Sequence, residues 1–157
     1  MTIDERLAEL GLVLPGPHPP HDPLDAVVVH GSVARTSGQL PRIDGRLTCV
    51  GIVGDTISVD EAHAAAAVCA LNALSVLRVA LGSLDRIERI LSVHGYVACA
   101  SYFDQQAAVI DGASRVLVDV FGERGRHTRS AIGVLALPRG SAVEIELTAA
   151  VTPNSER

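Results

Sequence analysis

The stretch SVDEAHAAAAVCALNALSVLRVALG, residues 58–82, carries the clearest structural signal in the chain. The Ser58 hydroxyl can accept a hydrogen bond from the Glu61 amide while the Glu61 carboxylate accepts one from the Ser58 amide, which is the reciprocal capping box of a helix start. Apolar residues follow with helical spacing, and Gly82 suits the position just after a helix end. The stretch therefore predicts one long helix, whose many alanines allow close packing against a sheet.

Upstream of this helix the sequence favours short strands. Residues 26–30 and 33–40 are rich in β-branched residues and flank a Gly-Ser pair, which predicts a hairpin. An Asp-Gly pair between residues 40–43 and 47–53 favours a tight two-residue turn. We therefore expect the strands to continue as a meander.

Downstream of the helix, two strand patterns follow a second helical pattern. Residues 89–99 predict a strand, and Asp104 is the expected cap of a helix that runs to Phe121. Residues 128–137 and 142–151 predict the last two strands. This order of elements predicts an α+β layer sandwich, in which one mostly antiparallel sheet has both helices packed on one face.

We divide the chain into three parts. Residues 1–25 form an arm with a short helical turn and most of the prolines, residues 26–151 form the folded domain, and residues 152–157 form a disordered tail.

The composition limits the choice of partners. The net charge of -5 argues against binding to nucleic acid, because neutralising phosphates needs a basic surface. No apolar run approaches the roughly 18 residues that span a bilayer, so we expect no membrane partner. Three widely spaced cysteines, Cys49, Cys69 and Cys99, fit buried, reduced thiols, and the N-terminus does not resemble a secretory signal. We therefore expect a cytoplasmic protein.

Arg129 and Glu144 are the first candidates for chemistry. They lie on consecutive predicted strands, which we expect to be close together. A guanidinium offers two parallel donors to a carboxylate, and a partly desolvated glutamate can act as a general acid or base. The pair suits a small organic acid, although a structural ion pair or solvated charges at the sheet edge would give the same pattern. The face that carries Arg129 and Ala131 is small and apolar, which predicts a subunit interface.

His127 precedes Arg129 by two residues, so both side chains should point to the same side of a strand. It could donate to a substrate or shuttle a proton, or it could be an ordinary turn histidine. The other histidines show no metal-ligand spacing, and the chain has no GxSxG or GxGxxG motif. We expect neither a metal nor a cofactor.

Several motifs resemble a known family. The segment TSGQLP at residues 36–41 is similar to a (T/S)SGQ(I/L)P element, and RSAIGV at 129–134, followed by an LP turn and VEIE at 143–146, is similar to the closing motifs of the RidA (YjgF) family. The resemblance covers residues 27–151. DGAS at 111–114 and the GRHTRSAIG motif resemble a divergent branch of that family.

The resemblance implies a chorismate-mutase-like fold and a homotrimer with sites in the clefts between subunits. It also implies hydrolysis of enamines or imines, such as 2-aminoacrylate, to a 2-keto acid and ammonia. In that scheme Arg129 holds the substrate carboxylate, Glu144 positions or activates water, and Ser37 lines the cleft.

Three positions depart from the family pattern and put the choice of substrate in question. Ala131 stands where a pocket cysteine is usual, Leu24 replaces a tyrosine, and Asp111 replaces an asparagine on a helix. An acid at Asp111 could repel a second carboxylate or select an amine-bearing ligand. The alternative to an enzyme is a non-catalytic trimer that senses or carries a small carboxylic acid. An endoribonuclease ranks last, because the chain is acidic and poor in aromatic residues.

Overall fold

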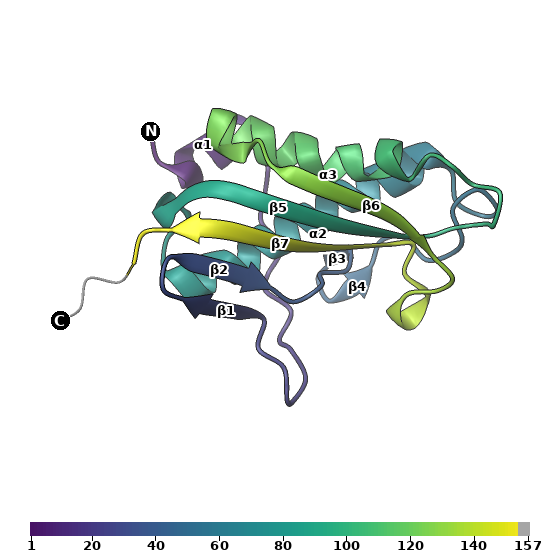
Figure 1. Cartoon of the computed structure of the whole chain (residues 1–157), viewed down its shortest axis with the longest axis horizontal. Helices are drawn as coiled ribbons and strands as arrows, with labels where there is room; N and C mark the ends of the chain where they lie inside the picture. Colours follow the sequence, from purple (N-terminus) through teal and green to yellow (C-terminus); the bar gives the residue numbers. More distant parts are fainter. Residues whose placement is uncertain (154–157) are drawn as a thin grey trace.

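The computed structural model describes residues 1–153. Five strands form one sheet in the order β1-β2-β7-β5-β6, and two long helices cover one of its faces (Figure 1). The pairs β1-β2, β2-β7 and β5-β7 are antiparallel, and β5-β6 is parallel. In chain order the elements are α1 (Ile3–Glu9), β1 (Val27–His30), β2 (Val33–Thr36), β3 (Arg42–Ile43), β4 (Arg46–Leu47), α2 (Val59–Leu81), η1 (Leu84–Arg86), β5 (Ile87–Ala98), α3 (Gln106–Phe121), η2 (Gly122–Gly125), β6 (Thr128–Val134), η3 (Pro138–Gly140) and β7 (Val143–Val151). The predicted α+β layer sandwich is confirmed.

The long helix α2 begins and ends as its sequence predicts. Ser58 and Glu61 form both hydrogen bonds of the capping box, and Gly82 takes the left-handed conformation after the last turn. By length and mean hydropathy alone α2 could cross a membrane, although Asn72, Ser75 and Arg78 divide its apolar residues into shorter runs. The most apolar part of α2 is 61% buried inside the fold, which is typical of a core helix.

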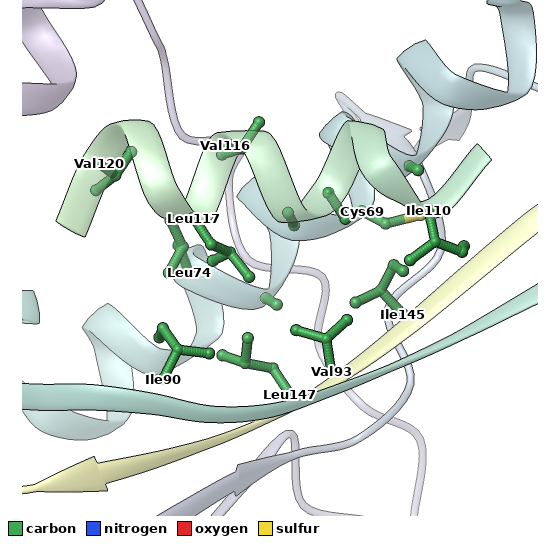
Figure 2. Close-up of a cluster of buried hydrophobic side chains, with 14 of the residues drawn as sticks. Cys69, Leu74, Ile90, Val93, Ile110, Val116, Leu117, Val120, Ile145 and Leu147 are labelled. Atoms are coloured by element: carbon green, nitrogen blue, oxygen red, sulfur yellow. The ribbon is translucent and has the colours of Figure 1, made fainter. Parts of the chain in front are cut away.

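The core lies between the two helices and the sheet. Figure 2 shows Leu74 of α2 and Leu117 of α3 pointing toward Val93 and Leu147 of the sheet. All four are at most 1% exposed, and burying one such side chain stabilises the fold by about 1.5–3 kcal/mol. A Cβ atom at Gly112 would overlap the main-chain carbonyl of His63. The glycine, which costs helix stability, therefore lets α3 lie close against α2.

Strand order corrects one prediction. Strands β6 and β7 are not neighbours, because β5 lies between them: Val93 of β5 pairs with Arg129, and Tyr96 of β5 pairs with Glu144. The expectation that the strands of Arg129 and Glu144 are close together is therefore wrong.

The predicted interface face of β6 lies on the helix-covered side of the sheet. Ala131 packs against the core, and Arg129 forms hydrogen bonds with α3, so this face of β6 turns toward the helices. The small residues on it make room for α3, and a subunit contact at this face stays a prediction. The uncovered face of β6 is the opposite one, where Ile132 is 49% exposed.

Two local predictions need correction. The Asp-Gly turn is present, with φ of 52° at Asp44 and 75° at Gly45, but β3 and β4 form a separate two-stranded sheet and do not continue a meander. Asp104 does not cap α3. The cap position is Gln105, whose side chain makes no capping hydrogen bond. Cys49 and Cys69 are buried free thiols as predicted, whereas Cys99 is only partly buried.

The two ends of the chain are attached to the core in different ways. Helix α1 buries Ile3 and Leu7, and the Ile3 amide donates to Asp85 at 2.8 Å. Thr152 exchanges hydrogen bonds with Arg86, so this part of the predicted tail is ordered. The predicted disorder of residues 154–157 lies outside the described residues.

Candidate functional site

The structure separates the candidate residues into two groups on opposite faces of the sheet. Arg129 pairs with the buried Val93 and shares its helix-covered face. Glu144 lies between Val143 and Ile145, which both point into the core, so its own side chain is on the uncovered face. Within one chain the two side chains therefore cannot touch the same small molecule.

Glu144 lines a surface cavity of about 320 Å³ together with Ser37, Gly38 and Leu24. The Ser37 hydroxyl donates a hydrogen bond to the main-chain carbonyl of Asp25 at 2.6 Å. This bond joins two segments of the chain at the cavity wall. Burial raises the pKa of Glu144, and the neighbouring Glu146 carboxylate raises it further. A carboxyl group with a raised pKa can exchange protons closer to neutral pH, as general acid or base catalysis requires.

The neighbouring Glu146 is held differently from Glu144. Its Oε1 accepts from Arg35 at 3.1 Å and lies 2.8 Å from His94 Nδ1. Arg35 and His94 thus hold the Glu146 carboxylate on the uncovered face, and its negative charge is the second cause, after burial, of the raised pKa of Glu144.

The second group surrounds Arg129 on the helix-covered side. Its Nη1 donates to Asp111 at 2.7 Å and to the Ser114 hydroxyl at 3.2 Å. His127 Nε2 lies 2.9 Å from the same hydroxyl, and His127 Nδ1 lies 2.6 Å from the Gly125 carbonyl. The Arg129 side chain is 23% exposed and that of Asp111 is 50% exposed, so the group can be reached from solvent.

The hydrogen-bond roles in this group follow from its acceptors. A carbonyl oxygen can only accept, so Nδ1 of neutral His127 carries the proton and Nε2 accepts from the Ser114 hydroxyl. The Ser114 oxygen then accepts from Arg129. The bond to Gly125 orients the His127 ring, and His127 orients the Ser114 hydroxyl. Ser114 in turn helps to orient the Arg129 guanidinium.

The structure thus brings together Arg129, Asp111 and His127, and separately Ser37 and Glu144, while Ala131 lies beside the first group against the core. Whether they bind a substrate stays a prediction. Sequence reasoning missed Ser114 in the first group, although it follows Asp111 by three residues and so shares its helix face. It also missed five residues that line the cavity or its margin: Gly38, Asn72, Arg42, Arg139 and His18.

Metal binding finds no support in the part of the chain that the structure describes. Within residues 1–153, no three side chains of His, Cys, Asp or Glu lie close enough together to hold an ion.

Comparisons with known proteins match this fold. A family model described as "YjgF/chorismate_mutase-like, putative endoribonuclease" matches residues 4–151. Protein TCP17 of Trypanosoma cruzi is 40% identical over 145 residues, which is 92% of this chain and 91% of that protein. The chain belongs to the YjgF/chorismate mutase-like family.

Two solved structures are similar over nearly the whole chain. Atu1372 from Agrobacterium tumefaciens, a protein of unknown function, has 37% identity and a TM-score of 0.90, with 97% of this chain and 94% of that chain covered. A "putative endoribonuclease" from Shewanella oneidensis has 32% identity and a TM-score of 0.93, with 96% and 100% covered. The predicted fold and family are confirmed.

Proposed function

We propose that this protein hydrolyses small carboxylate-bearing enamines or imines to 2-keto acids and ammonia, as a homotrimer. The observation that carries the proposal is Glu144, a half-buried carboxyl group with a raised pKa in a cavity large enough for a small substrate. An imine carbon is already electrophilic, so its hydrolysis needs mainly a positioned water and one proton transfer.

In this scheme Glu144 takes a proton from water as the water oxygen attacks the imine carbon. The carbon–nitrogen double bond becomes single, and the nitrogen receives the proton that Glu144 took from water. When the tetrahedral intermediate collapses, Glu144 takes the hydroxyl proton and passes it to the amine nitrogen, the hydroxyl oxygen forms the keto group, and ammonia leaves with the electron pair of the carbon–nitrogen bond. Water is the only co-reactant.

Arg129 is proposed to hold the substrate carboxylate with the donors that Asp111 does not use. Because Arg129 and Glu144 face opposite sides of one sheet, one substrate can contact both only if they come from two subunits. Two features support such an assembly: β6 is an edge strand, and the uncovered face exposes Val28, Val33 and Ile132. Exposed apolar side chains on an open sheet face favour association.

The test is ammonia release from freshly generated 2-aminoacrylate, measured above the spontaneous rate, together with the mass in solution. We expect turnover and a mass about three times that of the 16.4 kDa chain. Saturable binding of 2-keto acids without turnover would contradict the proposed enzyme activity and support a non-catalytic trimer that binds carboxylates. A monomeric protein at micromolar concentration would contradict a site shared between Arg129 and Glu144 of two subunits.

A further inference from the structure

The cavity that contains Glu144 is also lined by Arg42, Arg139 and His18. Within residues 1–153 neither arginine forms an ion pair. We propose that Arg42 and Arg139 bind a second anionic group on the substrate, a carboxylate or a phosphonate-like group distinct from the carboxylate that Arg129 holds. This inference rests on the proposed function for the first carboxylate, and it assigns the substrate class: imines of amino acids with an acidic side chain.

The main chain at Arg42 is fixed by the core. The buried Asn72 of α2 donates to the Arg42 carbonyl at 2.9 Å, and the Arg42 amide donates to Leu40 at 2.9 Å. The Arg42 side chain is partly buried at the cavity wall. Because the main chain of Arg42 is held on both sides, its side chain starts from a fixed position at the cavity wall.

Arg139 reaches the same cavity from the other end of the chain. It lies in η3, where its φ of 57° places a residue with a side chain in the left-handed region. This conformation is unfavourable for residues other than glycine. A hydrogen bond of 3.0 Å from the Gly51 amide to the Gly140 carbonyl joins the η3 turn to the segment that follows β4. The turn thus brings a second guanidinium to the lining of the same cavity.

The cations are close enough to affect one another. Burial lowers the pKa of Arg42, and the charge of Arg139 lowers it further. Burial also lowers the pKa of His18, followed by the charges of Arg42 and Arg139. Like charges brought together repel, and an anion between them would remove that repulsion. Guanidinium groups bind carboxylates and phosphates through paired donors, so both anions fit this chemistry.

Glu144 does not supply the missing negative charge. The two arginines do not offset the rise in its pKa, whose causes are burial and Glu146. Within residues 1–153 Glu144 forms no ion pair with either arginine, so both guanidinium groups are left for a substrate side chain.

The experiment measures binding of three stable probes to the full-length protein by calorimetry. The probes are 2-oxobutanoate, with one carboxylate, 2-oxoglutarate, with two, and 3-phosphonopyruvate, with one carboxylate and one phosphonate. We expect at least one of the doubly anionic probes to bind about tenfold or more tightly than 2-oxobutanoate. The tighter of the two identifies the second group as a carboxylate or a phosphonate.

The variants are R42Q, R139Q and the control R46Q. Arg139 is exposed, so R139Q should fold even if R42Q does not, and thermal unfolding checks both. Arg46 lies on β4 outside the cavity lining. We expect R139Q and R42Q to remove the preference for the doubly anionic probe while 2-oxobutanoate binds within about twofold of the native affinity. R46Q should keep the preference.

Three results would overturn the inference: equal affinity for all probes, no binding of a doubly anionic probe, or equal losses in R46Q and R139Q. Ammonia release from 2-aminoacrylate separates this inference from the proposed function. If the native protein hydrolyses 2-aminoacrylate but shows no preference for a second anion, only the second site fails. If 2-oxoglutarate binds through Arg139 without any imine hydrolysis, only the proposed reaction fails.

Discussion

The main chain of Gly38 lies directly against the carboxyl group of Glu144. A Cβ atom added at Gly38 would overlap Glu144 Oε1 and its carboxyl carbon. Gly38 belongs to the SGQ motif, and its position explains why that motif needs a residue without a side chain. The glycine gives the carboxyl group room at the cavity wall.

The first prediction is that Gly38→Ala impairs activity more than stability. The added methyl group meets the far end of a flexible side chain, so Glu144 should rotate away at a cost below about 1 kcal/mol. Loss of the positioned carboxyl group should lower kcat for imine hydrolysis about tenfold to a hundredfold. Kinetics and thermal unfolding of the same variant check the two effects.

The control for this variant is Gly16→Ala, because a Cβ atom at Gly16 meets nothing within 4 Å. It should leave both activity and stability near native values. A fully active Gly38→Ala protein would show that the position of the Glu144 carboxyl group does not matter.

The second prediction concerns Ser114, which joins Arg129 to His127. Ser114→Ala removes one acceptor from Arg129 and leaves His127 Nε2 without its donor, so Arg129 should be less well oriented. Ligand carboxylates should bind more weakly by about 0.5–1.5 kcal/mol, the usual contribution of one hydrogen bond. The loss should appear in KM and in the Kd of 2-oxobutanoate, with little change in kcat.

Ser130→Ala is the matched control, since Ser130 is exposed next to Arg129 and points to the other face of β6. Equal losses in the two variants would mean that the hydrogen-bond chain to His127 does not position Arg129.

How far the sequence predicts this fold depends on how local each signal is. The capping box of Ser58 and Glu61 satisfies amides within one turn, so it needs no tertiary information and was predicted correctly. Asp104 offers a similar cap, but α3 begins after Gln105 and the aspartate is not used. A short polar side chain near a helix start is a weaker signal than a reciprocal pair.

Strand order is not local, and here the sequence misled. Glu144 follows Arg129 by a short connection, which suggests neighbouring strands, yet β5 lies between β6 and β7 because β6 pairs parallel to β5. Alternation along β6 predicted two faces correctly but not which face the helices cover. The sequence gives no sign of the left-handed conformation of Arg139. Glycine and asparagine are the residues that predict a positive φ, and arginine does not.

The third prediction tests the pairing of Arg129 with Asp111. Asp111→Asn keeps a hydrogen-bond acceptor beside Nη1 but removes the competing negative charge. Carboxylate ligands should therefore bind about two- to fivefold more tightly, in line with the energy of a partly exposed ion pair. Asp119→Asn removes a charge from the exposed side of the same helix and should have no such effect. Weaker binding in Asp111→Asn would show that the aspartate itself contacts the ligand.

The last prediction is that Glu144→Gln makes the protein more stable and less active at neutral pH. A carboxyl group whose pKa is raised by folding favours the folded state only while it is protonated. That contribution is complete below the pKa of the unfolded chain and is lost as the pH rises through the folded-state pKa. The charged form of Glu144 therefore lowers the free energy of unfolding, because the side chain is half-buried and lies near the charge of Glu146.

Glutamine keeps the shape of the side chain and cannot ionise. The free energy of unfolding of Glu144→Gln should exceed that of the native protein at pH 7. The difference should shrink as the pH falls through the raised pKa of Glu144 and be largely gone below about 4, where both side chains are neutral. The rate constant kcat should fall by roughly 10²–10⁴ while 2-keto acids still bind. Unfolding curves from pH 3 to pH 8 and imine hydrolysis at neutral pH measure the two effects.

Glu146→Gln separates this effect from the simple removal of a negative charge. Glu146 is paired with Arg35 and His94, so its loss should lower stability by up to about 1 kcal/mol, opposite in sign to Glu144→Gln. If Glu144→Gln were destabilised at pH 7, the half-buried carboxylate would have a favourable partner, and its proposed role as a proton acceptor with a raised pKa would be lost. If the Glu144→Gln variant were more stable and fully active, the Glu144 carboxyl group would not take part in imine hydrolysis.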